Sequence, residues 1–234
     1  MSNQYEGARA YVPVGERSSE VRADFVTRTY NHLMGSIVLF TLIEFYLFST
    51  GIAESIAAVM LQGSWLIVLG GFVLVSWLAT RVAATSESLP AQYAALGGFI
   101  VAESLIFVPL LFVANQMAPG LISSAALVTL VGFGGLTAVA FTTRKDFSFL
   151  GGLLRWAGIV ALLGIVAAVL FGFELGTWFS VAMVGLAGAA ILYDTSNVLH
   201  HYPEDRYVAA ALQLFASVAM MFWYVLRIFM ASRD

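Results

Sequence analysis

The segment ILYDTSNVLHHYPEDRY, Ile191 to Tyr207, decides the fold. It closes a strongly apolar run that carries one carboxylate, Asp194, and it leads directly into a short polar loop. An ionisable side chain within such a run is costly unless it has a partner or a function. The segment therefore predicts a helix that ends at a membrane surface, with Asp194 as the first candidate for a functional residue.

The composition is that of a membrane protein. Hydrophobic residues make up 60% of the chain and charged residues 11%, with a mean hydropathy of +0.89, whereas soluble domains are roughly half apolar and a quarter charged. The net charge of -3 and the scattered Lys and Arg exclude a nucleic-acid-binding protein. The absence of Cys excludes disulfides, iron-sulfur clusters and thiolate metal sites.

The chain divides into a tail and a membrane domain. Residues 1–29 mix Arg with Glu and Asp, which predicts a mobile cytoplasmic tail, and they contain no signal-peptide core. Residues 30–234 are predicted to form an all-α bundle of seven transmembrane helices, each able to cross about 30 Å of hydrocarbon. The predicted spans are Tyr30 to Thr50, Gly63 to Thr80, Ala94 to Ala114, Gly120 to Thr142, Trp156 to Phe173, Trp178 to Leu199 and Val208 to Phe229.

The positive charges predict the orientation of these spans. Arg and Lys gather on the side of the amino terminus, whereas the connections at 51–62, 115–119 and 172–175 contain neither. By the positive-inside rule the amino terminus is cytoplasmic, and seven spans then place Arg233 and the carboxyl terminus outside. The competing topology has a re-entrant final segment.

Three carboxylates fall inside the predicted spans: Glu44, Glu103 and Asp194. Because each costs at least about 2.5 kcal/mol near the bilayer centre, we expect them to face one another or a wet cavity. Glu103 has bulky apolar neighbours on its own helical face and is followed by Pro109. It is either part of an ion pathway or a neutral side chain hydrogen-bonded inside the bundle. Glu44 is expected to pair with the third span.

Asp194 is the centre of a predicted polar cluster. It lies roughly 7 to 8 Å below the cytoplasmic boundary, and Asn197 shares its helical face. Gln213 and Ser217 of the last span reach a similar depth, and Arg81 at the end of the second span is the nearest candidate cation. The cluster either pins the helices together or acts as a latch that protonation of Asp194 would release.

The remaining motifs give weaker signals. His200 and His201, beside two acidic residues, could titrate near neutrality or touch a divalent ion, and the alternative is that they are ordinary loop residues. The segment TTRKDFSFLGG, Thr142 to Gly152, is predicted to be a cytoplasmic anchor turn with Asp146 at a helix cap. No phosphate-binding loop, HExxH, nucleophile elbow or dinucleotide fingerprint is present, so we expect no enzymatic activity and no cofactor.

Four segments carry a resemblance to a known family. TTRKDFSFLGG, ILYDTSNVLHHYPEDRYVAAALQLF, RTYNHL and the closing ASRD together resemble the Bax inhibitor-1 family and, within it, the bacterial YccA-type branch. The resemblance implies seven helices with the last surrounded by the other six, in the bacterial inner membrane. It also implies, for some bacterial members, a pH-sensitive calcium leak.

In those members two aspartates of the last two helices form a sensor pair, with an arginine of the second helix as its latch. The first aspartate corresponds to Asp194 and the arginine to Arg81, whereas the second falls on Ser217. Without two carboxylates the shared-proton chemistry of that pair cannot operate in the same way. Glu103 is the candidate substitute, and Asp194 and Glu103 are the candidate calcium ligands.

Two functional hypotheses follow. The first is a cation leak, with calcium or protons as the mobile ions, gated by Asp194, Arg81, Ser217 and Gln213, with Glu103, Glu44 and Asn197 along the pathway. The second comes from the YccA-type branch, whose members are associated with the membrane protease FtsH as substrates and modulators. In this alternative the amino-terminal tail engages the protease and nothing is transported.

Overall fold

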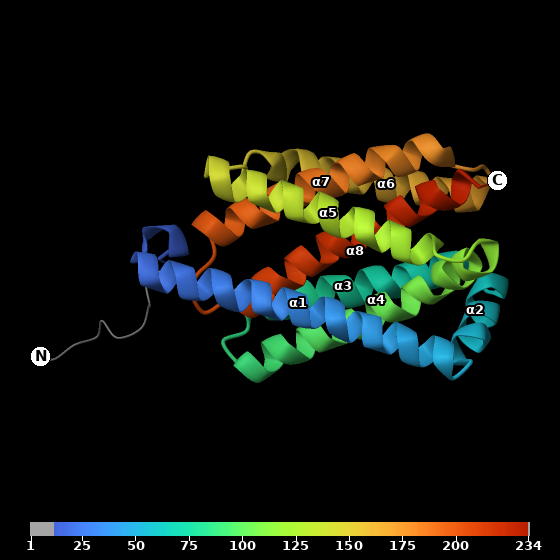
Figure 1. Ribbon diagram of the computed structural model, residues 1–234, viewed down its shortest axis with the longest axis horizontal. Coiled ribbons are helices and arrows are strands. Elements are labelled where there is room, and N and C mark those ends of the chain that lie inside the picture. The colour runs from blue at the N-terminus through green and yellow to red at the C-terminus, as the bar shows by residue number, and fades with distance from the viewer. Residues whose placement is uncertain (1–11, 234) are drawn as a thin grey trace, which may run out of the picture.

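The computed structural model describes residues 12–233, which are almost entirely helical (Figure 1). Seven of its helices are long and apolar enough to cross a membrane, which confirms the all-α membrane fold. They are α1 (Ser19–Ser49), α3 (Trp65–Thr85), α4 (Leu89–Met117), α5 (Leu121–Thr143), α6 (Leu150–Phe171), α7 (Gly176–His200) and α8 (Tyr207–Ala231). A 3₁₀ turn, η1 (Val14–Glu16), and a short helix, α2 (Ile52–Gln62), complete the structure.

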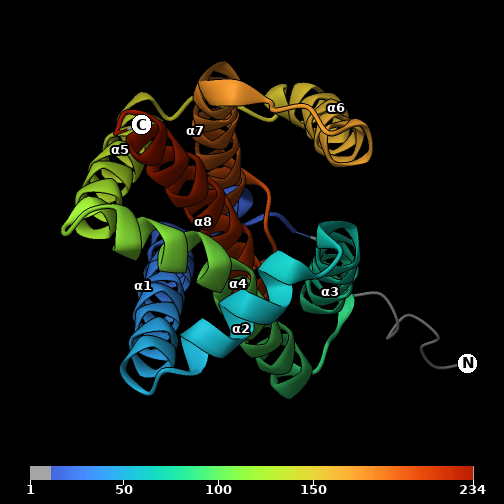
Figure 2. The ribbon, with the colours of Figure 1, turned by 90° about the vertical axis from the view of Figure 1, so that its right-hand side faces the viewer.

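The last helix, α8, is the centre of the bundle (Figure 2). It contacts α1, α3, α4, α5 and α7, and small residues such as Ala210 and Ala211 allow these neighbours to approach closely. Its 25 residues rise about 37 Å, more than the roughly 30 Å of hydrocarbon. The last helix is therefore continuous and long enough to cross the membrane, as the seven-span prediction requires. One detail differs from the expected arrangement, because the backbone of α6 packs on α7 and α3 and not on α8.

The chain is already ordered before residue 29. Ser18 caps α1 by accepting a hydrogen bond from the Val21 N–H (3.4 Å), and Phe25 and Thr29 lie buried one turn apart. The mobile tail predicted for residues 1–29 is therefore wrong for residues 12–29, and residues 1–11 lie outside the described part. The buried residues recur at helical spacing beneath a charged face, and the charges concealed this pattern in the sequence.

The short helix α2 was not predicted. Gly51, with φ 77°, turns the chain at the end of α1, and α2 then crosses the end of the bundle opposite to the start of α1 (Figure 2). Its buried residues Ala53 and Ala57, four positions apart, pack with Val108 of α4. The segment was expected to be a loop, because 11 residues are too few to span a membrane.

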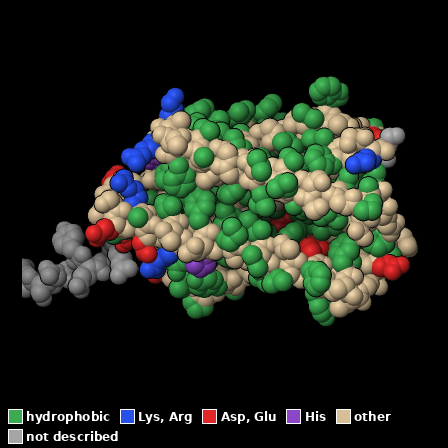
Figure 3. Space-filling model, viewed as in Figure 1, with side chains coloured by type: hydrophobic (Ala, Val, Ile, Leu, Met, Phe, Trp, Pro, Cys, Tyr) green, Lys and Arg blue, Asp and Glu red, His purple; other side chains and the backbone are tan. Residues whose placement is uncertain are grey.

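The charged side chains concentrate at one end of the bundle, where α1, α4, α6 and α8 begin (Figure 3). We call this the amino-terminal end. Along the flanks the surface is apolar, with large exposed side chains such as Phe45 (72%) and Trp178 (86%). Such a belt between polar ends fits a protein whose sides face lipid.

Candidate functional site

Asp194 and Ser217 join α7 to α8 inside the bundle. Asp194 is only 2% exposed, and the Ser217 hydroxyl donates a hydrogen bond of 2.5 Å to its Oδ2. This distance is typical of a hydroxyl bonded to a carboxylate, the stronger class of hydrogen bond. The structure therefore brings together the two residues that the sequence placed at similar depth on the last two spans.

The predicted ion pair between Asp194 and Arg81 is wrong in this structure. Arg81 is exposed, and its guanidinium lies 5.3 Å from the centre of the Trp77 ring on the same helix. Within residues 12–233 the Arg81 side chain makes no ion pair, and α3 has no contact with α7. The sequence placed Arg81 near the end of its span, as observed, but could not show that α3 and α7 are not neighbours.

Gln213 and Asn197 do not bond to Asp194 either. Gln213 lies one turn before Ser217 and is half-buried, and its side chain has no hydrogen bond to another described residue. The backbone carbonyl of Asn197 accepts the N–H groups of His201 (2.8 Å) and Tyr202 (3.1 Å), which ends α7. The polar cluster predicted around Asp194 is therefore reduced to a pair.

Three hydroxyls that the sequence analysis missed lie near this pair. The Tyr30 hydroxyl on α1 lies near Thr137 of α5, Thr195 of α7 and the Asp194 carboxylate. All three hydroxyl oxygens are buried, and they lie close enough to interact with one another. Thr195 directly follows Asp194, but only the packing of α1 and α5 on α7 shows that Tyr30 and Thr137 belong to the same region.

Glu103 lies on the other side of α8 from Asp194. It is 6% exposed on α4, one turn after Phe99, whose ring centre lies 6.1 Å from that of Phe215 on α8. Ser217 is two residues beyond Phe215, or about 200° around the helix, and faces α7 instead. The expectation that the membrane acids share one cavity is therefore wrong for these two.

Glu44 is buried on α1 without a partner. It is 7% exposed, and neither carboxylate oxygen has a hydrogen-bond partner among the described residues, so the expected pairing with the third span, α4, is absent. No three His, Asp or Glu side chains between residues 12 and 233 are grouped so that they could hold a metal ion. The assignment of Asp194 and Glu103 as candidate calcium ligands stays a prediction.

Comparison with known proteins identifies the family of this chain. The model of the family described as inhibitor of apoptosis-promoting Bax1 matches residues 22–234, nearly the whole chain. The chain belongs to the Bax inhibitor-1 family.

Relatives within and beyond bacteria are similar in sequence to this chain. The chain is 40% identical over 112 residues to an uncharacterized protein of Pseudomonas aeruginosa, an alignment that covers 46% of this chain and 49% of the relative. It is 38% identical over 100 residues to the modulator of FtsH protease YccA of Escherichia coli (42% and 45% covered). Bax inhibitor 1 of Schizosaccharomyces pombe is 27% identical over 223 residues (92% and 79% covered). The chain thus spans about half the length of the first two relatives.

Membership in the Bax inhibitor-1 family allows the contact between Asp194 and Ser217 to be compared with the aspartate pair that the resemblance implies for some members. The resemblance placed the second aspartate of some members at Ser217, and the structure shows that the side chain at this position does bond Asp194. A hydroxyl donates a hydrogen bond but carries no charge at neutral pH. This Bax inhibitor-1 family protein therefore has, at this position, a contact between one carboxylate and one hydroxyl.

A second polar network lies at the amino-terminal end, in the TTRKDFSFLGG segment. Asp146 accepts the Ser148 N–H at 2.8 Å and lies 3.0 Å from Nε2 of His201, while the Ser196 hydroxyl accepts the Phe147 N–H at 2.9 Å. The Ser148 backbone N–H, together with His201, holds the pKa of Asp146 below its usual range. The predicted helix cap is wrong, because α6 starts only at Leu150 and Asp146 instead closes the preceding turn.

Proposed function

We propose that this Bax inhibitor-1 family protein is a multi-pass protein of the bacterial inner membrane that modulates a membrane-bound protease of the FtsH type. The observation that carries the proposal is the 38% identity to YccA, a relative named for that activity. The structure supports it through the amino-terminal segment. The Val14 N–H donates a hydrogen bond of 2.8 Å to the Tyr202 carbonyl, so the chain enters the fold beside the connection between α7 and α8.

The test separates the tail from the folded domain. Deleting residues 1–11 removes only sequence outside the described fold and leaves the Val14 contact in place. We expect the truncated chain to lose co-purification with FtsH and to lose its effect on the rate at which FtsH degrades a second membrane protein in proteoliposomes. A chain in which the same eleven residues are scrambled is the control. Unchanged engagement of the truncated chain would contradict the proposal.

The proposal includes an orientation, with the amino terminus cytoplasmic and the carboxyl terminus periplasmic. It is supported by the positive charges at the amino-terminal end and by the odd number of spans. Because the chain has no Cys, single Cys substitutions of Ser2 and Ser232 can be labelled without background. In intact spheroplasts a membrane-impermeant maleimide should label only the second variant. The reverse pattern would overturn the orientation.

A second function, a proton-dependent cation leak with calcium as the candidate ion, is favoured by one observation. Asp194 is almost fully buried with a single neutral donor, and three buried hydroxyls of the described chain lie in its neighbourhood. Because a charge in this position is costly, the gain or loss of one proton changes the energetics of the α7–α8 contact. Arg81 has no part in this version of the gate.

Calcium flux into liposomes tests the leak. We expect flux that depends on pH between about 6 and 8, that is lost in Asp194→Asn and that increases in Ser217→Asp, which restores a second carboxylate. Gln213→Glu, one turn away on α8, is the control for a charge that does not touch Asp194. If wild type and Ser217→Asp both remain impermeable to calcium across this pH range, the leak is excluded, and modulation of the protease is the proposed function that remains.

A further inference from the structure

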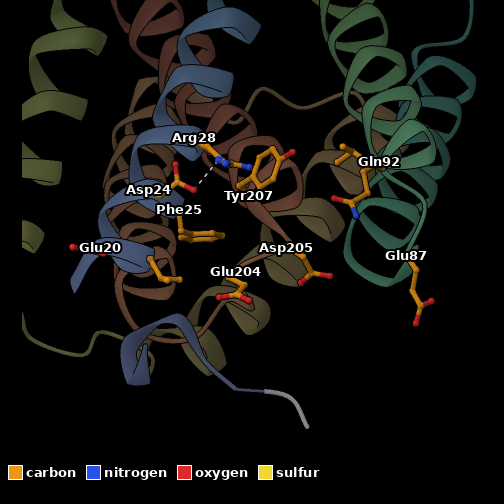
Figure 4. Close-up of a pocket in the computed structure, with 11 residues that line it drawn as sticks. Glu20, Asp24, Phe25, Arg28, Glu87, Gln92, Glu204, Asp205 and Tyr207 are labelled. Atoms are coloured by element: carbon orange, nitrogen blue, oxygen red, sulfur yellow. Dashed lines mark ion pairs between the residues drawn. The ribbon is translucent and has the colours of Figure 1, made fainter. Parts of the chain in front are cut away.

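A cavity of about 600 Å³ opens at the amino-terminal end, and Asp194 is not among the residues that line it (Figure 4). It lies between the start of α1, the connection from α3 to α4 and the connection from α7 to α8. Such a volume lies within the range that small molecules occupy in proteins. Five carboxylates line it, from Glu20, Asp24, Glu87, Glu204 and Asp205.

The charges around this cavity do not balance. Three carboxylates have a guanidinium partner, and the pairs are Asp24 with Arg28 (2.9 Å), Glu204 with Arg17 (3.4 Å) and Asp205 with Arg206 (3.6 Å). Glu20 and Glu87 have no ion pair with any residue between 12 and 233. Five carboxylates against three guanidiniums leave two negative charges unmatched, which favours a ligand with at least two positive charges.

Gln92 provides an independent sign of a ligand. Its side chain is 2% exposed on α4, and its Nε2 donates a hydrogen bond of 3.0 Å to the Ser86 carbonyl. Its Oε1 accepts no hydrogen bond from any described residue. In Figure 4 the amide points from α4 toward the space beside Tyr207 and Asp205. A buried acceptor without a donor is unfavourable and uncommon, and an N–H donor placed in the cavity would satisfy it.

We infer that this cavity binds a small organic polycation that carries two or more ammonium groups. The Glu20 and Glu87 carboxylates and the Gln92 Oε1 are all acceptors, and ammonium groups supply only donors. The apolar side chains of Phe25 and Leu89 offer a surface for the methylene segments between the charges. The inference does not depend on the proposed modulator function or on the leak.

A metal ion fits this cavity less well. Calcium requires six to eight oxygen ligands at about 2.3–2.6 Å, and no group of three acidic or His side chains in the described chain could hold a metal. The carboxylates instead come from three separate parts of the chain. A flexible ligand with separated charges can reach them without bringing them together.

The experiment uses the full chain in nanodiscs of zwitterionic lipid, so that the lipid does not bind the probe. Titration calorimetry with spermidine at physiological salt should show saturable binding to wild type and at least about tenfold weaker binding to the double variant Glu20→Gln, Glu87→Gln. The control is Glu54→Gln, Glu174→Gln, which removes the same charge at the opposite end. Both pairs of residues are exposed, so neither change should affect folding.

Two further measurements decide the remaining outcomes. Gln92→Met, which keeps the side-chain volume and removes the amide acceptor, should weaken spermidine binding at least about threefold. Equal binding by the two double variants, or no saturable binding by wild type, would overturn the inference. It would also be overturned if calcium bound more tightly than spermidine and lost affinity in the same variants.

Discussion

The polar groups at the amino-terminal end and those inside the bundle differ in how many partners they have. At the end, carboxylates lie beside cations or donors, as in Arg17 with Glu204 (3.4 Å) and Asp146 with His201 (3.0 Å). In the interior, Glu44 has no partner among the described residues, and Asp194 has one hydroxyl. Most of the polar contacts therefore lie at the exposed amino-terminal end. Each contributes little to the free energy of unfolding there, because water and salt screen exposed pairs.

This difference indicates which region carries stability and which carries function. A buried carboxylate without a cation lowers stability, and proteins retain such groups mainly where they act. The exposed network instead positions the chain connections around the start of α8. If this view is correct, removing an interior acid should stabilise the protein, whereas substitutions at the amino-terminal end should weaken the packing there.

The largest effect is expected for Glu44→Leu. Replacing an unpartnered buried carboxylate by an apolar side chain should raise the free energy of unfolding by about 2 kcal/mol or more. Unfolding of the protein in mixed micelles with increasing denaturing detergent measures it. Glu54→Leu, at an exposed position of α2, is the control and should change little. A less stable Glu44→Leu protein would show that the carboxylate has an essential partner.

The next effect, in the opposite direction, is expected for Ser217→Ala. This change removes the only described donor to Asp194 and should lower the free energy of unfolding by about 1–3 kcal/mol. The same unfolding assay applies. Ser104→Ala is the matched control, because Ser104 is equally buried but bonds the Ile100 carbonyl of its own helix (2.9 Å). Similar losses in both variants would mean that the contact with Asp194 has no special weight.

Gly15→Ala tests the amino-terminal end. A Cβ at this position would lie 2.9 Å from the His200 carbonyl oxygen and 3.1 Å from its Cα, both backbone atoms. The 3₁₀ turn should therefore shift away from α7, which should lower the free energy of unfolding by about 1 kcal/mol. The Val14 amide should then exchange its hydrogen faster. Gly35→Ala, where a Cβ meets no atom within 4 Å, should be neutral or stabilising. Unchanged exchange at Val14 would contradict the close packing.

The smallest effect is expected for Asp146→Asn. The folded state lowers the pKa of Asp146, so its ionised form stabilises the fold above about pH 4, and this contribution disappears as the pH falls further. Because the side chain is 47% exposed, the loss should be only about 0.2–1 kcal/mol. The difference between wild type and variant in thermal unfolding should narrow below about pH 4. A constant difference at all pH values would assign the effect to packing.

The sequence predicted the spans well because their signal is local. A run of about 20 apolar residues between polar connections can be recognised without knowing its neighbours, and the fourth span, predicted as Gly120 to Thr142, is observed as Leu121–Thr143. Segments that mix polar and apolar residues gave a weaker signal. The start of α1 and the whole of α2 were both assigned to the connections or the tail, although their buried residues recur at helical spacing.

The sequence by itself determined that the chain lies in a membrane, how many times it crosses, and that Asp194 occupies a costly position near the end of the sixth span. Only the tertiary structure decided which groups Asp194 meets: Ser217 instead of Arg81, with Tyr30 and Thr137 nearby and Glu103 across α8. The physical reason is that span and depth depend on hydrophobicity along one helix. Contact depends on which helices are neighbours and on how each is rotated about its axis, and that is fixed by packing around α8.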